Sequence, residues 1–127
     1  MRTVLVALVL LLVTPPLGLL VMLSGMMGVR DRAGSIYDWA PRLWSRLVLR
    51  AAGVRVVVHH PERMRAGAPH IFVANHVSWF DVFTLASLLP RYKFVGKAEL
   101  FRIPLFGRAA RAAGMIPIER ENRKSAF

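Results

Sequence analysis

The feature that most constrains this chain is an uncharged apolar segment near its amino terminus, residues Val4–Leu23, built mostly from Val, Leu and Ala. Its length is close to the ~20 residues that a membrane-spanning helix requires. Thr14-Pro15-Pro16 interrupts it, and consecutive prolines remove amide donors and kink or break a helix. The segment therefore predicts either one bent span or two short apolar arms in the membrane.

A secretory signal peptide is the competing interpretation, because Arg2 precedes the apolar run. No small-residue cleavage site follows Val13 closely, and apolar character resumes at Leu17. We therefore favour a retained membrane anchor over residues 1–30. The arginines that follow it are Arg30, Arg32, Arg42 and Arg46. By the positive-inside rule, they predict that the remainder lies on the cytoplasmic face of the inner (plasma) membrane.

The composition of the whole chain agrees with a membrane location. Its net charge is +11 and 55% of its 127 residues are hydrophobic. Disordered basic tails are less apolar, and soluble domains are seldom this basic. The combination suits a protein that rests on an anionic membrane or handles phosphorylated substrates. Cysteine is absent, which excludes disulfides, thiolate metal sites and a cysteine nucleophile.

A basic amphipathic helix is predicted within residues 31–53, over Ser35–Ala52, with Gly53 ending it. Apolar residues recur at helical steps, and a second stripe of arginines stands four residues apart, at Arg42, Arg46 and Arg50. Trp39 and Trp44 suit the headgroup level of a membrane. The alternative is an ordinary amphipathic helix whose apolar stripe faces the core and whose arginines face solvent.

The remaining residues, 54–127, alternate between strand and helix patterns. Strands are predicted at Val54–His59, Ile71–Ala74, Tyr92–Gly96 and Met115–Ile118. Helices are predicted at Trp79–Leu89, Ala98–Phe101 and Leu105–Ala113. Such alternation is typical of an α/β layered core. His59, His60 and His70 have no acidic or cysteine partner at ligand spacing, so no metal site is predicted.

The segment around His76 carries the most specific chemical pattern. The apolar run Ile71–Ala74 leads into Asn75-His76, and Asp81 follows five residues after the histidine. Ser78 or Asp81 can cap the next helix, which places His76 on a turn where Asp81 can fold back onto the imidazole. A carboxylate on one ring nitrogen leaves the other free to take a proton from a hydroxyl. Alternatively, Asp81 only complements the helix dipole.

Two more patterns follow. In Lys97-x2-Leu100-x3-Pro104-x2-Gly107, the lysine after a strand is able to meet a phosphate, or simply faces solvent, and Gly107 permits close packing. In the stretch 114–120, Gly114 closes the preceding helix and Arg120 emerges at a strand end.

These three blocks, in this order, resemble the glycerolipid acyltransferases, the family of 1-acylglycerol-3-phosphate acyltransferases. The resemblance covers Asn75–Arg120. It implies that His76 is the general base, that Asp81 orients it, and that Lys97 and Arg120 bind the substrate phosphate. Asn75, Gly107 and Gly114 would support the motifs. The implied reaction moves a fatty acyl group from acyl-CoA or acyl-carrier protein to lysophosphatidic acid, giving phosphatidic acid at the membrane without a metal or bound cofactor.

The chain also departs from the family pattern, because nothing in it matches the further block Phe-Pro-Glu-Gly-Thr-Arg. The expected fold is therefore an α/β acyltransferase domain that is incomplete at its carboxyl end, behind an amino-terminal membrane-anchoring helical segment.

Other acceptors stay open, such as a lyso-ornithine lipid or glycerol 3-phosphate. So does a non-catalytic basic protein that binds membrane surfaces. Nucleic-acid binding is disfavoured, because the aromatic residues are not interleaved with the basic ones. An acyl-serine route through Ser78 is disfavoured, because no oxyanion-loop signature accompanies it.

Overall fold

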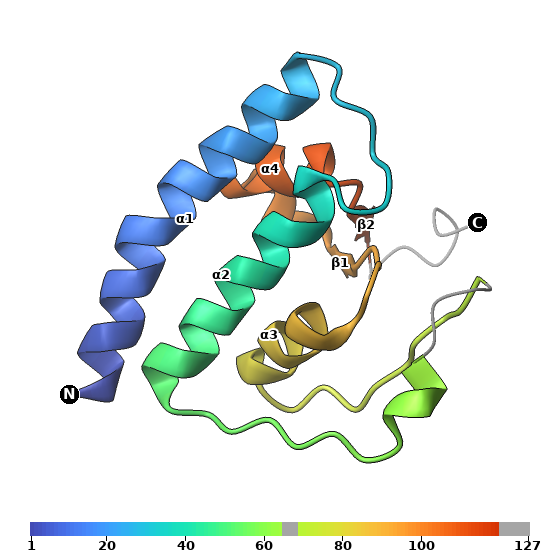
Figure 1. Cartoon of the computed structure of the whole chain (residues 1–127). Coiled ribbons are helices and arrows are strands. Elements are labelled where there is room, and N and C mark those ends of the chain that lie inside the picture. The colour runs from blue at the N-terminus through green and yellow to red at the C-terminus, as the bar shows by residue number, and fades with distance from the viewer. Residues whose placement is uncertain (65–68, 120–127) are drawn as a thin grey trace.

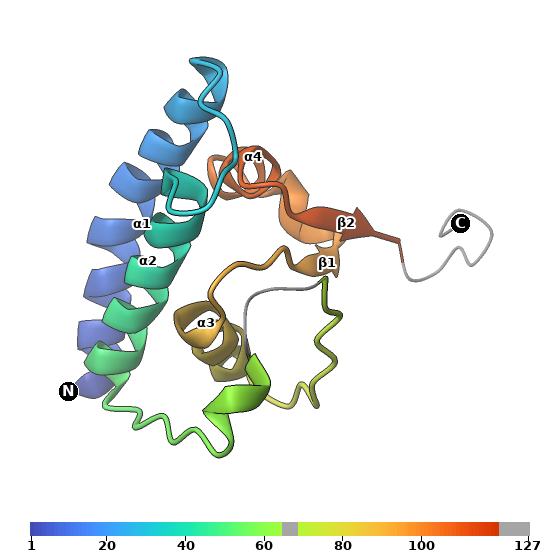
Figure 2. The same ribbon diagram turned by 45° about the vertical axis from the view of Figure 1, so that its right-hand side comes forward.

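The computed structural model describes residues 1–64 and 69–119 of the chain. Two long helices, α1 and α2, run antiparallel and side by side (Figures 1 and 2). Helix α3 packs on α2, and α4 packs on α1. The described elements are α1 (Arg2–Met26), α2 (Ile36–Ala52), the 3-10 helix η1 (Pro61–Met64), α3 (Trp79–Leu88), β1 (Val95–Lys97), the 3-10 helix η2 (Ala98–Arg102), α4 (Phe106–Ala112) and β2 (Ile116–Ile118).

Helix α1 runs without a break through Pro15 and Pro16, so the structure has one helix and not two arms. The two prolines have no backbone N–H, so α1 lacks two of its helical hydrogen bonds, but packing against α2 supports the helix at this point. Trp44 of α2 donates a hydrogen bond from Nε1 to Oγ1 of Thr14, one residue before the proline pair, at 2.9 Å. By length and composition, α1 is able to cross a membrane, with a mean hydropathy of 2.7 over an 18-residue window.

Helix α2 has the bounds that the sequence predicts. Ser35 is its N-cap, and Gly53 ends it in the left-handed conformation at φ 68°. A residue with a Cβ is strained at such an angle, which is why glycine commonly closes helices.

Two arginines of α2 bind the protein itself, whereas Arg50 is exposed, as the solvent-facing alternative predicts. Arg42 Nη2 donates to the carbonyl oxygens of Leu89 (2.7 Å) and Pro90, and Arg46 Nη2 donates to that of Ser87 (3.5 Å). Two of the three arginines therefore bind the carboxyl end of α3. The reason is that carbonyls at the end of a helix lack intrahelical donors and carry partial negative charge.

Trp44 is half-buried and packs between α1 and α3. Besides its bond to Thr14, its ring meets Phe83 of α3 edge to face, with 5.1 Å between the ring centroids. Trp39 is 43% exposed and is the tryptophan of α2 that remains free to contact lipid headgroups.

Two of the predicted strands do not form. Residues 54–59 and 71–74 have no strand pairing, and Val57, Ile71 and Val73 are 65%, 93% and 91% exposed. Local sequence favours an extended backbone in both segments, but a strand also needs a partner for its ladder hydrogen bonds. Among the described residues, pairing is confined to β1 and β2.

Strands β1 and β2 form a small parallel sheet, with Val95 opposite Ile116 and Lys97 opposite Ile118. Helix α4 lies in the connection between them, as in other parallel pairs. The sequence places both strands correctly, although β1 begins three residues later than predicted and includes Lys97 as its last residue.

The buried core lies between the helices and not on the sheet. It consists of Val21 from α1, Tyr37 and Ala40 from α2, and Ala113 at the end of α4. The observed architecture is therefore a mixture of helices with a small parallel sheet, and only part of the predicted layered α/β core is present. The predicted anchor, basic helix and following segment share this core.

Candidate functional site

The turn before α3 is fixed by a reciprocal set of hydrogen bonds. Ser78 is the N-cap, and its Oγ accepts from the backbone N–H of Phe80 at 3.2 Å. Asp81 Oδ2 accepts in return from the backbone N–H groups of Ser78 and Val77, each at 2.8 Å. These bonds satisfy donors that the first turn of a helix leaves unpaired. The predicted cap is confirmed, and both Ser78 and Asp81 take part in it.

His76 lies against this carboxylate. Its Nδ1 is 3.3 Å from Asp81 Oδ2, the same oxygen that the two amides hold. The contact predicted from the turn is therefore present. With a proton on Nδ1, the imidazole donates to Asp81 and leaves Nε2 as a base. The side chain of His76 is 57% exposed, so a substrate can approach it.

The electrostatics of the turn keep Asp81 charged. Hydrogen bonds from the backbone N–H groups of Ser78 and Val77 lower the pKa of Asp81 below its ordinary value of 3.8, and His76 lowers it further. The carboxylate is therefore ionised at neutral pH and accepts hydrogen bonds without donating any. Such an anion orients an imidazole and stabilises the imidazolium that forms after proton uptake.

Lys97 lies at the carboxyl end of β1 and is exposed. Within the described part of the chain, no hydrogen bond or ion pair joins its side chain to His76 or Asp81. Asn75 is also exposed, beside His76 in the turn. Arg120 lies outside the described residues. The structure thus brings His76 and Asp81 into contact, while phosphate binding by Lys97 and Arg120 and the role of Asn75 stay predictions.

The two motif glycines have clear structural tasks. A Cβ on Gly107 would stand 2.1 Å from the carbonyl oxygen of Phe101, so only glycine allows α4 to approach η2 this closely. Gly114 follows α4 at φ 77°, and its N–H donates to the carbonyl of Arg111. Both roles match the sequence-based prediction of close packing at one glycine and helix termination at the other.

One charged cluster was not predicted. Asp31, between α1 and α2, contacts Lys93 Nζ at 2.7 Å and Arg91 Nη2 at 3.1 Å. Lys93 Nζ also donates to the carbonyl of Ala113 at 2.6 Å. These bonds fasten the segment that leads into β1. Sixty residues separate Asp31 from Arg91, and no periodic pattern marks that pair in the sequence.

A family model described as Acyltransferase matches residues 55–126, which is more than half of the chain. The chain belongs to the Acyltransferase family. The match contains His76, Asp81 and Lys97 as well as both motif glycines, and it begins after α2 ends.

This member of the Acyltransferase family is similar to two kinds of curated relative. It is 37% identical over 87 residues to the lyso-ornithine lipid O-acyltransferase of Rhizobium meliloti, covering 68% of the chain and 29% of that protein. It is 33% identical over 99 residues to the protein of the same name in Rhodobacter capsulatus, covering 76% and 34%. It is 40% identical over 57 residues to a chloroplastic 1-acyl-sn-glycerol-3-phosphate acyltransferase of Brassica napus, covering 45% and 17%.

The chain spans about a third or less of the length of these curated relatives. No solved structure matches the chain.

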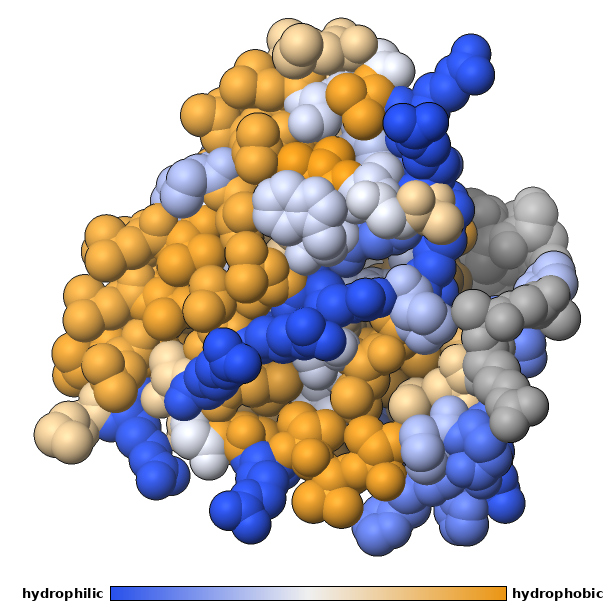
Figure 3. Space-filling model, in the orientation of Figure 1, coloured by the Kyte–Doolittle hydropathy of each residue, from blue (hydrophilic) through white to orange (hydrophobic). Residues whose placement is uncertain are grey.

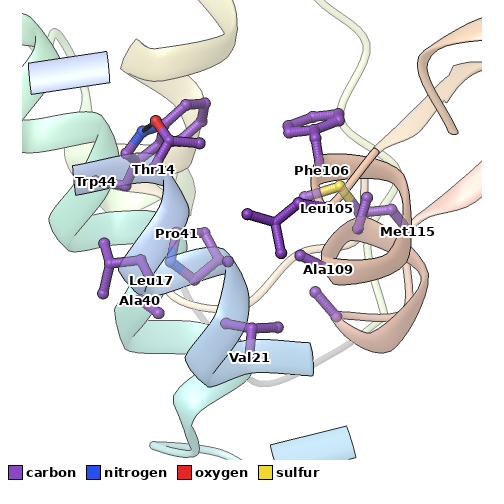
Figure 4. A pocket seen from close by; sticks show the side chains of 13 residues that line it. Thr14, Leu17, Val21, Ala40, Pro41, Trp44, Leu105, Phe106, Ala109 and Met115 are labelled. Carbon is purple, nitrogen blue, oxygen red and sulfur yellow. Dashed lines mark hydrogen bonds between the residues drawn. The ribbon is translucent and has the colours of Figure 1, made fainter. Parts of the chain in front are cut away.

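The chain also has an apolar pocket between α1, α2 and α4, with a volume of about 90 Å³ (Figure 4). Leu17 and Val21 line it from α1, Pro41 from α2, and Leu105 and Phe106 from the start of α4. None of the predicted site residues lines this pocket, and no sequence pattern predicted it. Its lining suits hydrocarbon and offers nothing to a charged group.

No group of three or more His, Asp or Glu side chains within residues 1–64 and 69–119 is arranged to hold a metal ion. His60 pairs with Glu62, its Nδ1 lying 3.1 Å from Oε1. That pair resembles His76 and Asp81 in chemistry but lies outside the three motif blocks.

Proposed function

We propose that this protein transfers a fatty acyl group from an acyl thioester to the free hydroxyl of 1-acyl-sn-glycerol 3-phosphate, giving phosphatidic acid. The observation that carries the proposal is the contact of His76 with an Asp81 carboxylate fixed by two backbone amides. The family and the chloroplastic relative supply the reaction class. Acyl-CoA or acyl-carrier protein would be the donor, and no metal or bound cofactor is needed.

In the proposed mechanism, Nε2 of His76 takes the proton of the acceptor hydroxyl while its oxygen attacks the thioester carbonyl carbon. The tetrahedral intermediate then breaks its C–S bond, and the leaving thiolate takes the proton from the imidazolium. Asp81 stabilises the imidazolium between these steps. General-base help of this kind typically contributes ~10²–10⁴ in rate. No acyl-enzyme forms, so Ser78 serves only as the cap.

Lys97 is proposed to bind the acceptor phosphate, together with Arg120. We expect Lys97→Ala to raise the KM for 1-acylglycerol 3-phosphate by about tenfold, because it removes one charged hydrogen-bond donor. The turnover number should change less. Initial rates over a range of acceptor concentrations measure both constants. Arg102→Ala, which removes an exposed cation from η2, is the matched control. Equal losses with phosphorylated and unphosphorylated acceptors would contradict the assignment of Lys97.

A lyso-ornithine lipid is the second candidate acceptor, because the relatives from Rhizobium and Rhodobacter match more of the chain than the chloroplastic one does. An acceptor panel separates the candidates. Purified protein in lipid-detergent micelles is given labelled acyl-CoA or acyl-carrier protein with 1-acylglycerol 3-phosphate, lyso-ornithine lipid or glycerol 3-phosphate. The preferred acceptor is the one with the highest kcat/KM, provided that His76→Ala abolishes transfer to it. Transfer to none of them would favour a membrane-binding role without catalysis.

Membrane attachment is proposed to occur through the outer face of α1, on the cytoplasmic side. This helix is apolar, and only 11% of its most apolar window is buried. In Figure 3 hydrophobic surface covers α1, while hydrophilic side chains cross the neighbouring α2. If α1 stood across a bilayer, α2 would be drawn into hydrocarbon with Arg42, Arg46 and Arg50. We therefore propose that α1 lies within one leaflet.

Because the chain has no cysteine, single introduced cysteines can test this arrangement. Thr3→Cys and Met27→Cys, which lie at opposite ends of α1, are expected to react with a membrane-impermeant maleimide from the same side of sealed vesicles. Modification of the two positions from opposite sides would show that α1 crosses the membrane. Arg55→Cys, beyond α2, reports the side on which the rest of the protein lies.

A further inference from the structure

We infer that Arg42 is a positioning residue for the proposed acyl transfer, because it fixes α3, which carries Asp81, relative to the segment leading to Lys97. The inference rests on the proposed function, but its structural part can be measured without turnover. Arg42 lies on α2, outside the family match and distant in sequence from the His76 turn.

A single atom of Arg42 ties α2 to the carboxyl end of α3 and to the residue that follows it. Its Nη2 donates to the carbonyl of Leu89, the C-cap of α3, at 2.7 Å, and to that of Pro90, the first residue after it. Carbonyls at the end of a helix have no intrahelical donor, and the negative end of the helix dipole favours a cation. Hydrogen bonds from a charged donor are also stronger than neutral ones.

Helix α2 is well placed to act as the fixed reference. Val48 and Ser45 are fully buried, and Trp44 links α2 to both α1 and α3. Arg46 adds a longer bond to the carbonyl of Ser87. The carboxyl end of α3 is therefore held by two arginines of α2, and the middle of α3 by a ring contact from the same helix.

The segment after α3 is held at two points. Arg42 binds the carbonyl of Pro90, and Asp31 binds Arg91 and Lys93. Burial raises the pKa of Tyr92 to about 12, and the positive charge of Arg42 partly opposes that rise. Three residues after Tyr92 the chain enters β1, whose last residue is Lys97.

The catalytic end of α3 has little packing of its own. Ala86, Ser87 and Leu89 are buried, whereas Trp79 and Phe80 at the other end are 66% and 37% exposed. The ten residues of α3 span ~15 Å at 1.5 Å per residue. If α3 rotates slightly about its carboxyl end, where Arg42 holds it, Asp81 and His76 at the opposite end move farther than Leu89 does. Errors of about 1 Å at a reacting centre can cost 10²-fold in rate.

The test compares Arg42→Ala and Arg42→Lys with Arg50→Ala in the complete protein. Arg50 is an exposed arginine on the same helix whose side chain has no partner within the described residues. We expect Arg42→Ala to lower kcat per folded molecule by about 10–100-fold, with Arg42→Lys in between, because an ammonium keeps the charge but loses the planar fork. Amide hydrogen exchange at Ala86–Leu89 should accelerate in Arg42→Ala, while exchange in α1 of the same variant should not change. In Arg50→Ala, exchange at Ala86–Leu89 should also stay as in the original protein.

Several results would overturn the inference. A kcat for Arg42→Ala within about twofold of the original, at temperatures where it is folded, would leave Arg42 a structural tie only. If Arg42→Ala does not fold, Arg42→Lys decides, and either an unchanged kcat or a lost fold in that variant rejects positioning. His76→Ala separates the two proposals. If it keeps full turnover, the proposed function fails, whereas inactive His76→Ala with fully active Arg42 variants rejects only the role of Arg42.

Discussion

Replacing His76 by alanine is expected to lower the turnover number for acyl transfer by about 10²–10⁴-fold, with little change in stability. The imidazole is the group in the turn that can accept a proton from the acceptor hydroxyl at neutral pH, since the neighbouring Asp81 carboxylate is engaged by two amides. The side chain is exposed, so its removal leaves no buried cavity. Steady-state rates with saturating acceptor and thioester measure the loss.

The chain offers a matched control in its other histidine–carboxylate pair. His60 contacts Glu62 at 3.1 Å, a distance similar to that between His76 and Asp81. The side chains of both histidines are exposed. We expect His60→Ala to keep full turnover, because its pair belongs to none of the three motif blocks. A comparable loss in both histidine variants would point to a general surface effect and would remove the case for His76.

Asp81→Asn tests the second half of the pair. Asparagine keeps the shape of the side chain and a carbonyl oxygen for the amides of Val77 and Ser78, but it has no charge to stabilise an imidazolium. Turnover should fall sharply while the helix content stays close to that of the original protein, as measured by circular dichroism. Full activity in this variant would mean that Asp81 serves only as a cap.

The largest effect on stability is expected for Gly107→Ala, which should cost more than about 3 kcal/mol in the free energy of unfolding. The added Cβ would stand 2.1 Å from the carbonyl oxygen of Phe101 and 2.5 Å from its carbonyl carbon. Backbone atoms cannot rotate away as a side chain can, so α4 would have to separate from η2. Because α4 also packs on α1, the change should loosen the helical core.

Gly96→Ala is the control for this prediction. The nearest atoms to a Cβ there belong to side chains of Phe101 and Leu100, at 3.6 and 3.9 Å, which is ordinary contact. Denaturant unfolding of both variants in the same detergent, followed by tryptophan fluorescence, measures the difference in stability. If Gly107→Ala unfolds at the same denaturant concentration as Gly96→Ala, the close approach of α4 to η2 is not required.

Local features were predictable because neighbouring residues decide them. Gly53 ends α2 and Ser78 caps α3, since the end of a helix depends on the backbone freedom and side-chain oxygens of residues within a few positions. A short turn also allows the contact between His76 and Asp81, although it does not require it. The resemblance to acyltransferases came from the same stretch of chain and agrees with the family match.

The sequence by itself determined that residues 4–23 are apolar, where α2 and α3 end or begin, and the family. Only the tertiary structure decided that α1 is one helix, that His76 contacts Asp81, that Arg42 binds the end of α3, and that 54–59 and 71–74 have no strand partner among the described residues. For Arg42 and the strands, the physical reason is range. A cap or a turn is completed by residues a few positions away, whereas a strand ladder or an arginine–carbonyl contact depends on segments that folding brings together from far along the chain.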